Sequence, residues 1–309
     1  MNANTHAQQL MRPEDLPRGI SAVRALPHES LDALWDSIIV ADDIKERLLS
    51  QAILNFALRP KVSRDQLPMH GVILLVGPPG TGKTSLARGL ASKLAGYMPK
   101  AKPQLIEVDP HALTSSAMGK TQRAVSELFS QTISEQASNG PTVVLLDEVE
   151  TLAADRSRMS LEANPVDIHR ATDAVLVQLD SLAERHPNIL FIATSNFPQA
   201  IDNAFTSRCD LVIEVPPPGQ EAVVQILEQC LSGLAKQFPA LATMVGSRDI
   251  ATIAHACEGL DGRALRKMVV NAMAMSRAVA VDPNKLTTAH LLAAAKDAKA
   301  ARSRKETSK

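Results

Sequence analysis

The chain carries a glycine-rich string whose residue types and spacing suit phosphate binding. The string consists of Gly77, Pro78, Pro79, Gly80, Thr81, Gly82, Lys83 and Thr84, and Ser85 follows it. An apolar run over 72–76 precedes it and a helical pattern follows, which is the context of a P-loop. The glycines let backbone N–H groups close around an anion, and the next helix start adds partial positive charge. We therefore expect Lys83 to reach the β- and γ-phosphates of ATP, and Thr84 to ligate Mg²⁺.

Two acids, Asp147 and Glu148, directly follow a second apolar run over 143–146. A buried parallel strand would deliver them to the carboxyl edge of the sheet, beside the P-loop. We expect Asp147 to hold Mg²⁺ and Glu148 to act as the general base toward the attacking water. An acidic pair after a strand can also serve only as favourable charge at a helix N-terminus. The complete P-loop upstream favours the catalytic interpretation.

Three further polar residues are candidates, each with an alternative. Asn196 follows the apolar run 189–194 and can orient water near the γ-phosphate, or begin a turn before Pro198. Arg208 can contact nucleotide across a subunit interface, where an arginine in trans stabilises transition-state charge, or lie in a surface loop. Arg263 opens a helix near the C-terminus and can reach bound phosphate from a second domain, or remain solvated.

The elements that must position these residues alternate along the chain. Apolar runs that read as strands lie at 72–76, 104–108, 142–146, 189–194 and 211–215. Helical patterns separate most of them, which predicts a parallel sheet covered on both faces. Three prolines at 216–218 mark a boundary, and only helical patterns follow. The predicted organisation is a flexible arm (1–30), a large α/β domain (31–216), a small helical domain (217–300) and a basic disordered tail (301–309).

Composition narrows the partners and the compartment. The 309 residues contain 33 basic and 33 acidic side chains, so the formal charge is zero, which argues against a dedicated nucleic-acid binder. The three cysteines, Cys209, Cys230 and Cys257, form no CxxC pair, which favours a reduced, intracellular protein and no thiolate metal site. We find no pattern of a signal peptide or a bilayer-spanning segment. We therefore expect a cytoplasmic protein with no membrane partner and no direct nucleic-acid partner.

The order of the motifs resembles that of AAA+ ATPases over about residues 31–280. The matching strings are GPPGTGKT, VVLLDE, ATSN, IDNAFTSRCD and GLDGRALRKM. More specific strings are similar to those of the pachytene-checkpoint branch, whose members remodel HORMA-domain proteins. These strings are LDALWDSII, DEVETLAADRSR, ATDAVLVQLD and TSNFPQAIDNAF. The resemblance implies an α/β fold, with a P-loop AAA+ parallel-sheet ATPase domain followed by a small all-α lid. It also implies a homohexamer with ATP and Mg²⁺ as cofactors.

The same resemblance assigns individual roles. It implies an adenine-pocket strand near Ser37 that contains Ile39. It makes Asn196 sensor 1, Arg208 the arginine finger and Arg263 sensor 2.

Two departures from the family shape the functional hypothesis. Eukaryotic members carry a folded N-terminal domain that engages the client, whereas about thirty residues precede the ATPase core here. This is similar to bacterial members that accompany HORMA proteins and cGAS-like nucleotidyltransferases in antiphage operons. The pore-loop position holds Ala117, Met118 and Gly119 without an aromatic, and Met118 can either grip a peptide or fill a core.

We therefore expect a hexameric ATP-driven remodeller that opens or disassembles HORMA complexes and damps such an antiphage signalling system. The alternatives are a general AAA+ unfoldase and an ATP-gated binding switch for another client.

Overall fold

The computed structural model describes residues 15–113, 120–154 and 165–307, and the chain divides into two compact units. The first unit extends to Asp36 and includes Asp42–Gly77 and Lys83–Glu214. The main part of the second unit starts at Val215. Two short segments from earlier in the chain, Ser37–Ala41 and Pro78–Gly82, also belong to the second unit. The tip of the glycine-rich loop therefore groups with the helical unit, a detail that a single boundary near residue 216 does not anticipate.

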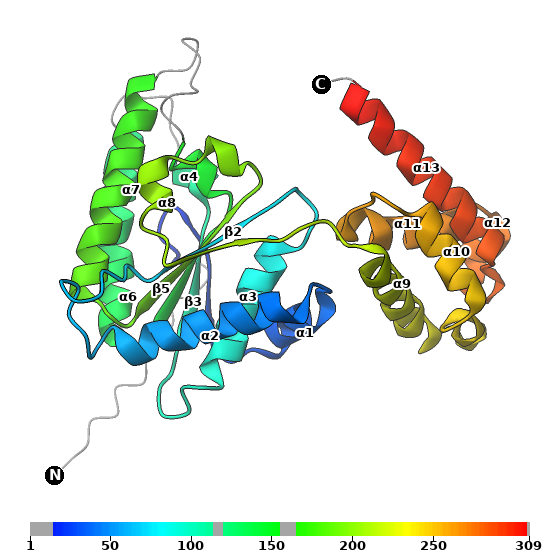
Figure 1. The fold of residues 1–309 in the computed structure, drawn as a ribbon, viewed down its shortest axis with the longest axis horizontal. Helices are drawn as coiled ribbons and strands as arrows, with labels where there is room; N and C mark the ends of the chain where they lie inside the picture. The colour runs from blue at the N-terminus through cyan, green and yellow to red at the C-terminus, as the bar shows by residue number, and fades with distance from the viewer. Residues whose placement is uncertain (1–14, 114–119, 155–164, 308–309) are drawn as a thin grey trace. The chain divides into compact units, whose positions relative to one another are not determined.

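The first unit is built on a six-stranded sheet with the order β1-β3-β4-β5-β2-β6 (Figure 1). The strands are β1 Ile20–Ala25, β2 Val72–Val76, β3 Gln104–Val108, β4 Thr142–Leu146, β5 Ile189–Ser195 and β6 Leu211–Glu214. All neighbouring pairs are parallel except β1 and β3, which are antiparallel. The carboxyl ends of β2, β4 and β5 therefore meet at one edge of the sheet, where ligands bind in folds of this kind.

Helices cover both faces of this sheet, as the apolar strands require. One face packs against a continuous helical stretch, where Phe129 stacks on Phe191 of β5 with ring centroids 6.0 Å apart. That stretch consists of α5 Lys120–Glu127, the π-helical turn η2 Leu128–Ile133 and α6 Ser134–Asn139, beside α7 Pro165–Arg185. The other face packs against α2 Asp42–Leu58 and α3 Lys83–Ala95 (Figure 1). Side chains on alternate strand positions thus fill two cores, one on each face.

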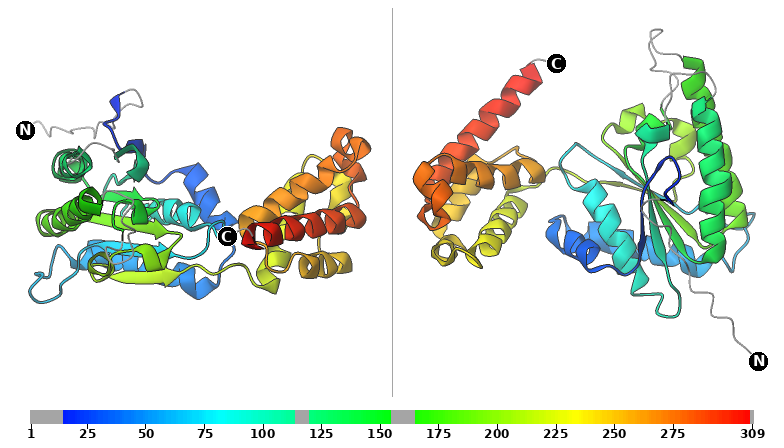
Figure 2. Two further views of the ribbon diagram at one scale, coloured as in Figure 1. Left: turned by 90° about the horizontal axis from the view of Figure 1, so that it is seen from above. Right: turned by 180° about the vertical axis from the view of Figure 1, so that it is seen from behind.

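The N-terminal segment differs from the flexible arm expected over residues 1–30. Within it, β1 forms the antiparallel edge of the sheet (Figure 2), and α1 Glu29–Ser37 begins at residue 29. Arg24 of β1 and Arg88 of α3 both contact the buried carboxylate of Glu107 on β3. This paired charge fixes the edge strand to the sheet, since a buried carboxylate needs cationic partners.

Short helical turns complete the first unit. They are α4 Pro110–Leu113, η3 Val149–Thr151, η5 Pro198–Ala200 and α8 Asn203–Thr206.

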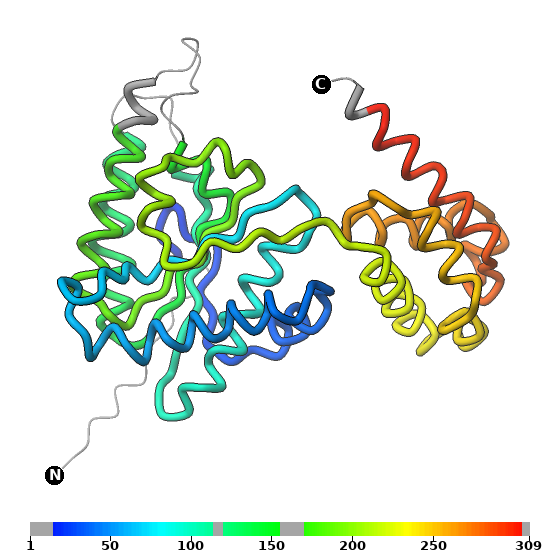
Figure 3. The backbone as a smooth tube through the Cα atoms, viewed as in Figure 1, coloured from blue at the N-terminus to red at the C-terminus, as the bar shows by residue number. Residues whose placement is uncertain are grey.

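The second unit is helical and has its own core, which includes Leu227, Leu231, Leu265, Met268 and Leu291. Its elements are α9 Gln220–Ala235, η6 Pro239–Met244, α10 Arg248–Ala256, α11 Gly262–Ala274, α12 Arg277–Val281, η7 Pro283–Lys285 and α13 Thr288–Thr307. Figure 3 follows this path in yellow to red.

The expected disordered tail from residue 301 is instead the last part of α13 as far as Thr307. Alanine, lysine and arginine favour helix strongly enough to continue it. Across the described ranges, none of the helices has the length and apolar character needed to cross a membrane.

Candidate active site

Lys83 begins α3 at the carboxyl edge of the sheet and is buried there. Its ammonium donates to the backbone oxygen of Gly77 and to Oδ1 of Asn196, each at 2.8 Å. The first bond spans the glycine-rich loop and holds its two ends together. The second joins that loop to the end of β5. The position predicted for phosphate binding thus has its cation fixed at a helix N-terminus, where the helix dipole adds to its charge.

Asp147 follows β4 and is held by two hydroxyl groups. Thr84 Oγ1 donates to Asp147 Oδ1 at 2.7 Å, and Thr194 Oγ1 of β5 donates to the same oxygen. The Thr194 hydroxyl also accepts the backbone N–H of Glu148 at 3.2 Å. One buried threonine therefore fixes both acids, and a hydroxyl and a carboxylate oxygen lie together as Mg²⁺ prefers.

Glu148 has a backbone conformation that glutamate rarely adopts. Its φ is +52°, and no other non-glycine residue in the described parts of the chain has a positive φ. Its Oε1 accepts from Asn196 Nδ2 at 3.1 Å, and its Oε2 lies 3.0 Å from His111 Nε2. Such strained residues are retained mainly where function requires a particular side-chain direction. The strain therefore singles out Glu148 independently of the sequence motif.

Asn196 connects the cation to this acid. Its Oδ1 accepts from Lys83, its Nδ2 donates to Glu148, and its backbone N–H donates to Glu150 Oε1 at 3.1 Å. The lysine can only donate and the ionised carboxylate can only accept, so the orientation of the amide is fixed. Three of the residues singled out from the sequence thus form one chain of contacts within the first unit.

The tip of the glycine-rich loop belongs to the second unit and lies against the start of α11. Gly80 and Gly82 have φ values of +85° and +96°, a region that favours glycine. The Gly80 oxygen accepts the backbone N–H of Arg263 at 3.2 Å. A Cβ on Gly80 would lie 2.2 Å from Oδ1 of Asp261, the residue that caps α11. The backbone of Arg263 is therefore adjacent to the loop, while its side chain is exposed.

The expected adenine-pocket strand is absent from this part of the described structure. Ser37 ends α1, and Ile38 and Ile39 follow without regular secondary structure. Ile39 instead packs against the helical core of the second unit, and a Cβ on Gly82 would lie 2.7 Å from Ile38 Cδ1. The strand prediction is corrected to an irregular segment beside the loop. Its backbone is held from a helix, since Arg266 donates to the Ser37 oxygen at 2.7 Å.

Arg208 lies apart from the chain of contacts around Asn196. Its Nε and Nη2 donate to the two carboxylate oxygens of Asp180 on α7, at 3.0 and 2.8 Å. Its Nη1 donates to the Ala204 oxygen at 2.7 Å. The hydrogen bonds and charge of Asp180 raise the pKa of Arg208 above its ordinary value. The predicted pore-loop residues Ala117, Met118 and Gly119 lie outside the described residues.

Three side chains near the acids were not singled out from the sequence. They are His111 beside Glu148, Thr194 between the two acids, and Glu150, whose Oε2 is buried without a hydrogen-bond partner among the described residues. His111 lies just after β3, and Thr194 lies near the end of β5. The rule that parallel strands deliver their carboxyl ends to one edge would have drawn attention to both.

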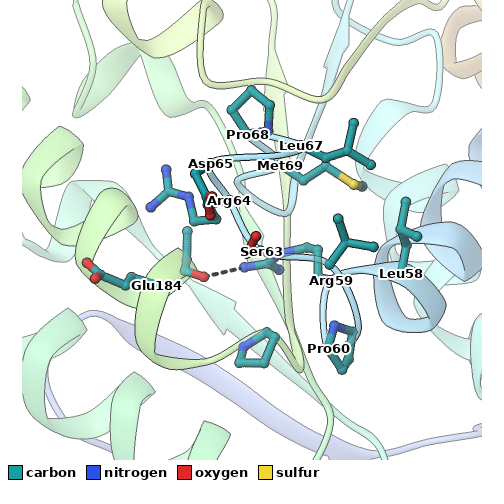
Figure 4. Close-up of a pocket in the computed structure, with 13 residues that line it drawn as sticks. Leu58, Arg59, Pro60, Ser63, Arg64, Asp65, Leu67, Pro68, Met69 and Glu184 are labelled. Atoms are coloured by element: carbon teal, nitrogen blue, oxygen red, sulfur yellow. Dashed lines mark hydrogen bonds between the residues drawn. The ribbon is translucent and has the colours of Figure 1, made fainter.

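The cavity drawn in Figure 4 is a different place. It has a volume of about 600 Å³ and is lined by the 58–69 segment and the end of α7. Arg59 in its wall donates to the oxygens of Ala183 and Ile189 at 2.9 and 2.6 Å. Burial lowers the pKa of Arg59 to about 10. None of the predicted site residues lines this cavity, so it is separate from the candidate active site.

Comparison with known proteins identifies the family. Residues 73–217 match the model of the ATPase family associated with various cellular activities (AAA). The chain is 64% identical to CD-NTase-associated protein 6 of Pseudomonas aeruginosa, over 92% of this chain and 93% of that protein. The chain belongs to the AAA ATPase family. The fold class expected from the sequence, a P-loop AAA+ domain followed by a helical lid, is confirmed, and so is the assignment as an ATPase.

Two further similarities define the branch of this AAA ATPase. This chain is 35% identical to the pachytene checkpoint protein 2 homolog of Oryza sativa subsp. indica, and the match covers 79% of this chain. It spans 59% of the length of that relative. A solved structure described as the E. coli MS115-1 HORMA:CdnC:Trip13 complex contains a chain of the same fold. The TM-score is 0.74 at 17% identity, with 90% of this chain and 95% of that chain covered. The expected resemblance to the pachytene-checkpoint branch is confirmed.

Proposed function

We propose that this ATPase works as a homohexamer that opens or disassembles complexes of a HORMA-domain protein. Its branch membership supports this, as does the HORMA component of the structurally similar E. coli complex. The CdnC component of that complex and the name of the Pseudomonas relative support a client linked to a cGAS-like nucleotidyltransferase. We further propose that remodelling makes the protein a negative regulator of such an antiphage system in the cytoplasm.

The observation that carries the hydrolytic part is the connected chain Lys83–Asn196–Glu148. It joins a fixed cation at a helix N-terminus to a strained carboxylate through one amide. A binding protein needs the cation, but it has no need of an acid held in a costly backbone conformation. The pairing therefore favours hydrolysis over simple nucleotide binding.

The residues take the following roles in this proposal. Bound ATP with Mg²⁺ supplies the phosphoanhydride bond that is cleaved. The loop from Gly77 to Thr84, with Ser85, surrounds the phosphates through backbone N–H groups, and Lys83 neutralises phosphate charge. Thr84 and Asp147 present the oxygen atoms that hold Mg²⁺, because their contact already brings these atoms together.

Glu148 takes the proton of the attacking water, and Asn196 sets the position of its carboxylate. A general base needs a defined direction toward the proton that it removes. The Nδ2 bond of Asn196 and the contact with His111 restrain the two carboxylate oxygens separately. The side chain of Glu148 is 47% exposed, so water reaches it.

Residues outside this chain of contacts complete the proposal. Arg208 acts on nucleotide held by a neighbouring subunit, and Arg263 contacts phosphate from the helical unit. Ile39 contributes to the adenine pocket. Ala117, Met118 and Gly119 form the client-gripping loop.

The client proposal is tested by capture with the Glu148→Gln variant. This variant is expected to retain the HORMA protein in the presence of ATP and Mg²⁺, because a complex that cannot hydrolyse ATP cannot complete a cycle. The Lys83→Ala variant is the matched control and should retain none. If neither variant retains the HORMA protein in any nucleotide state, this client assignment is wrong. Equal retention of unrelated unfolded proteins would favour the general unfoldase.

A further inference from the structure

The guanidinium of Arg208 is held from two sides within the first unit. Asp180 of α7 accepts hydrogen bonds from Nε and Nη2 of Arg208, one on each carboxylate oxygen. The backbone oxygen of Ala204, in α8, accepts a hydrogen bond from Nη1. An arginine side chain has five N–H donors in a rigid planar fork, so these three bonds leave two for another acceptor. The plane of the fork is fixed before any ligand is present.

Asp180 also contacts two other basic side chains. Its Oδ1 lies 3.3 Å from His70 Nε2 and 4.0 Å from Arg64 Nη2, and Arg64 also donates to its backbone oxygen at 3.2 Å. Burial by itself would raise the pKa of Asp180. The bond and charge of Arg208, with His70 and Arg64, instead hold that pKa below its ordinary value. The carboxylate is therefore ionised at neutral pH and offers both oxygens to Arg208.

The face of α7 that carries Asp180 also carries an exposed apolar side chain. Val177 precedes Asp180 by three residues, so the two side chains lie on the same face of the helix. Val177 is 62% exposed in the single chain. An apolar side chain beside an oriented arginine fits a surface that another copy of the chain covers.

We propose that Asp180 is a positioning residue that presents Arg208 to nucleotide bound by a second copy of this chain. The proposal rests on the trans role assigned to Arg208 above. A preorganised guanidinium avoids the loss of side-chain freedom when it meets the charge that develops in the transition state. A merely structural pair would tie α7 to the segment before β6 and would have no effect on turnover beyond stability.

The test compares Asp180→Asn with Glu184→Gln, which removes an exposed carboxylate one turn further along α7. The full chain is assayed for steady-state ATPase, ATP affinity, oligomeric state and melting temperature. Asp180→Asn is expected to lower kcat roughly 10- to 100-fold with KM for ATP nearly unchanged, since small misplacements cost this much. Glu184→Gln should leave kcat unchanged, and Asp180→Glu should restore part of the lost activity.

Two further measurements separate positioning from structure. Adding Asp180→Asn to Arg208→Ala should cause no additional loss, because the second change has nothing left to misplace. Asp180→Asn subunits mixed with Glu148→Gln subunits should regain activity, as Arg208→Ala subunits should. Additive losses, or a normal kcat for Asp180→Asn, would overturn the proposal.

The outcome for Arg208→Ala alone distinguishes the two levels of the argument. If Arg208→Ala keeps normal ATPase activity, the trans role fails and the positioning role fails with it. If Arg208→Ala is inactive while Asp180→Asn is normal, only the positioning role fails. Should Asp180→Asn unfold, the Arg64→Met variant tests the same carboxylate, with a smaller expected fall in kcat. A normal kcat for that variant would then count against the proposal.

Discussion

Replacing Asn196 with alanine removes the amide that joins Lys83 to Glu148. Two hydrogen bonds to charged groups are lost, at 2.8 and 3.1 Å, while Lys83 keeps its bond to Gly77. Bonds of this kind contribute roughly 1.5–3 kcal/mol each. Because Glu148 is 47% exposed, solvent screens its bond, and we take roughly 1.5–2 kcal/mol as the loss in positioning the base. This corresponds to a fall in kcat of about 10- to 30-fold.

The assay for Asn196→Ala pairs steady-state ATPase rates with calorimetric measurement of ATP binding. Affinity for ATP should change by less than about threefold, because Lys83 and the loop remain. Asn139→Ala, at an exposed position in the same unit, is the matched control and should behave like the wild type. A normal kcat, or a loss that lies wholly in ATP affinity, would refute the role given to this amide.

Two other substitutions test separate parts of the structure. Lys83→Ala should abolish measurable ATP binding by calorimetry, because phosphate charge loses its fixed partner, and unchanged binding would contradict the P-loop assignment. Glu107→Gln should lower the free energy of unfolding by about 2 kcal/mol in urea titrations, because Arg24 and Arg88 lose the buried charge between them. This figure is below that of a fully buried pair, because both arginines are about one-third exposed. If the free energy of unfolding of Glu107→Gln differs from that of the wild type by less than about 0.5 kcal/mol, as for a neutral surface change, the structural role of that carboxylate is contradicted.

The sequence was most informative where the pattern is local. The five parallel strands are rich in apolar residues, and their predicted positions match the structure closely. The signal is strongest in β2, β4 and β5, which are buried at every position because both faces of the sheet are covered there. β1 was missed because it lies at the edge of the sheet and most of its residues are only partly buried or exposed, so its hydrophobic pattern is weak. It pairs with β3, whose Glu107 contacts Arg24 of β1 from more than 80 positions away in the chain.

The candidate active site shows the same contrast between local sequence patterns and contacts between residues far apart in the chain. Lys83, Thr84, Asp147 and Glu148 belong to contiguous motifs, so their types and spacing alone predicted the chemistry. Asp180 ends the phrase ATDAVLVQLD, but its partner Arg208 lies 28 positions further along the chain, and nothing in that phrase indicates this contact. Such partners become visible only when the packing of α7 against the segment before β6 is known.

The central claim is that Glu148 is the base of an ATP-hydrolysing site, and the Glu148→Gln variant tests it most directly. The purified variant is incubated with ATP and Mg²⁺, and the nucleotide that remains bound is identified by chromatography. The amide cannot accept the proton of the attacking water, so the bound nucleotide should remain ATP, with affinity close to that of the wild type. The accumulation of ADP at the wild-type rate would contradict the account.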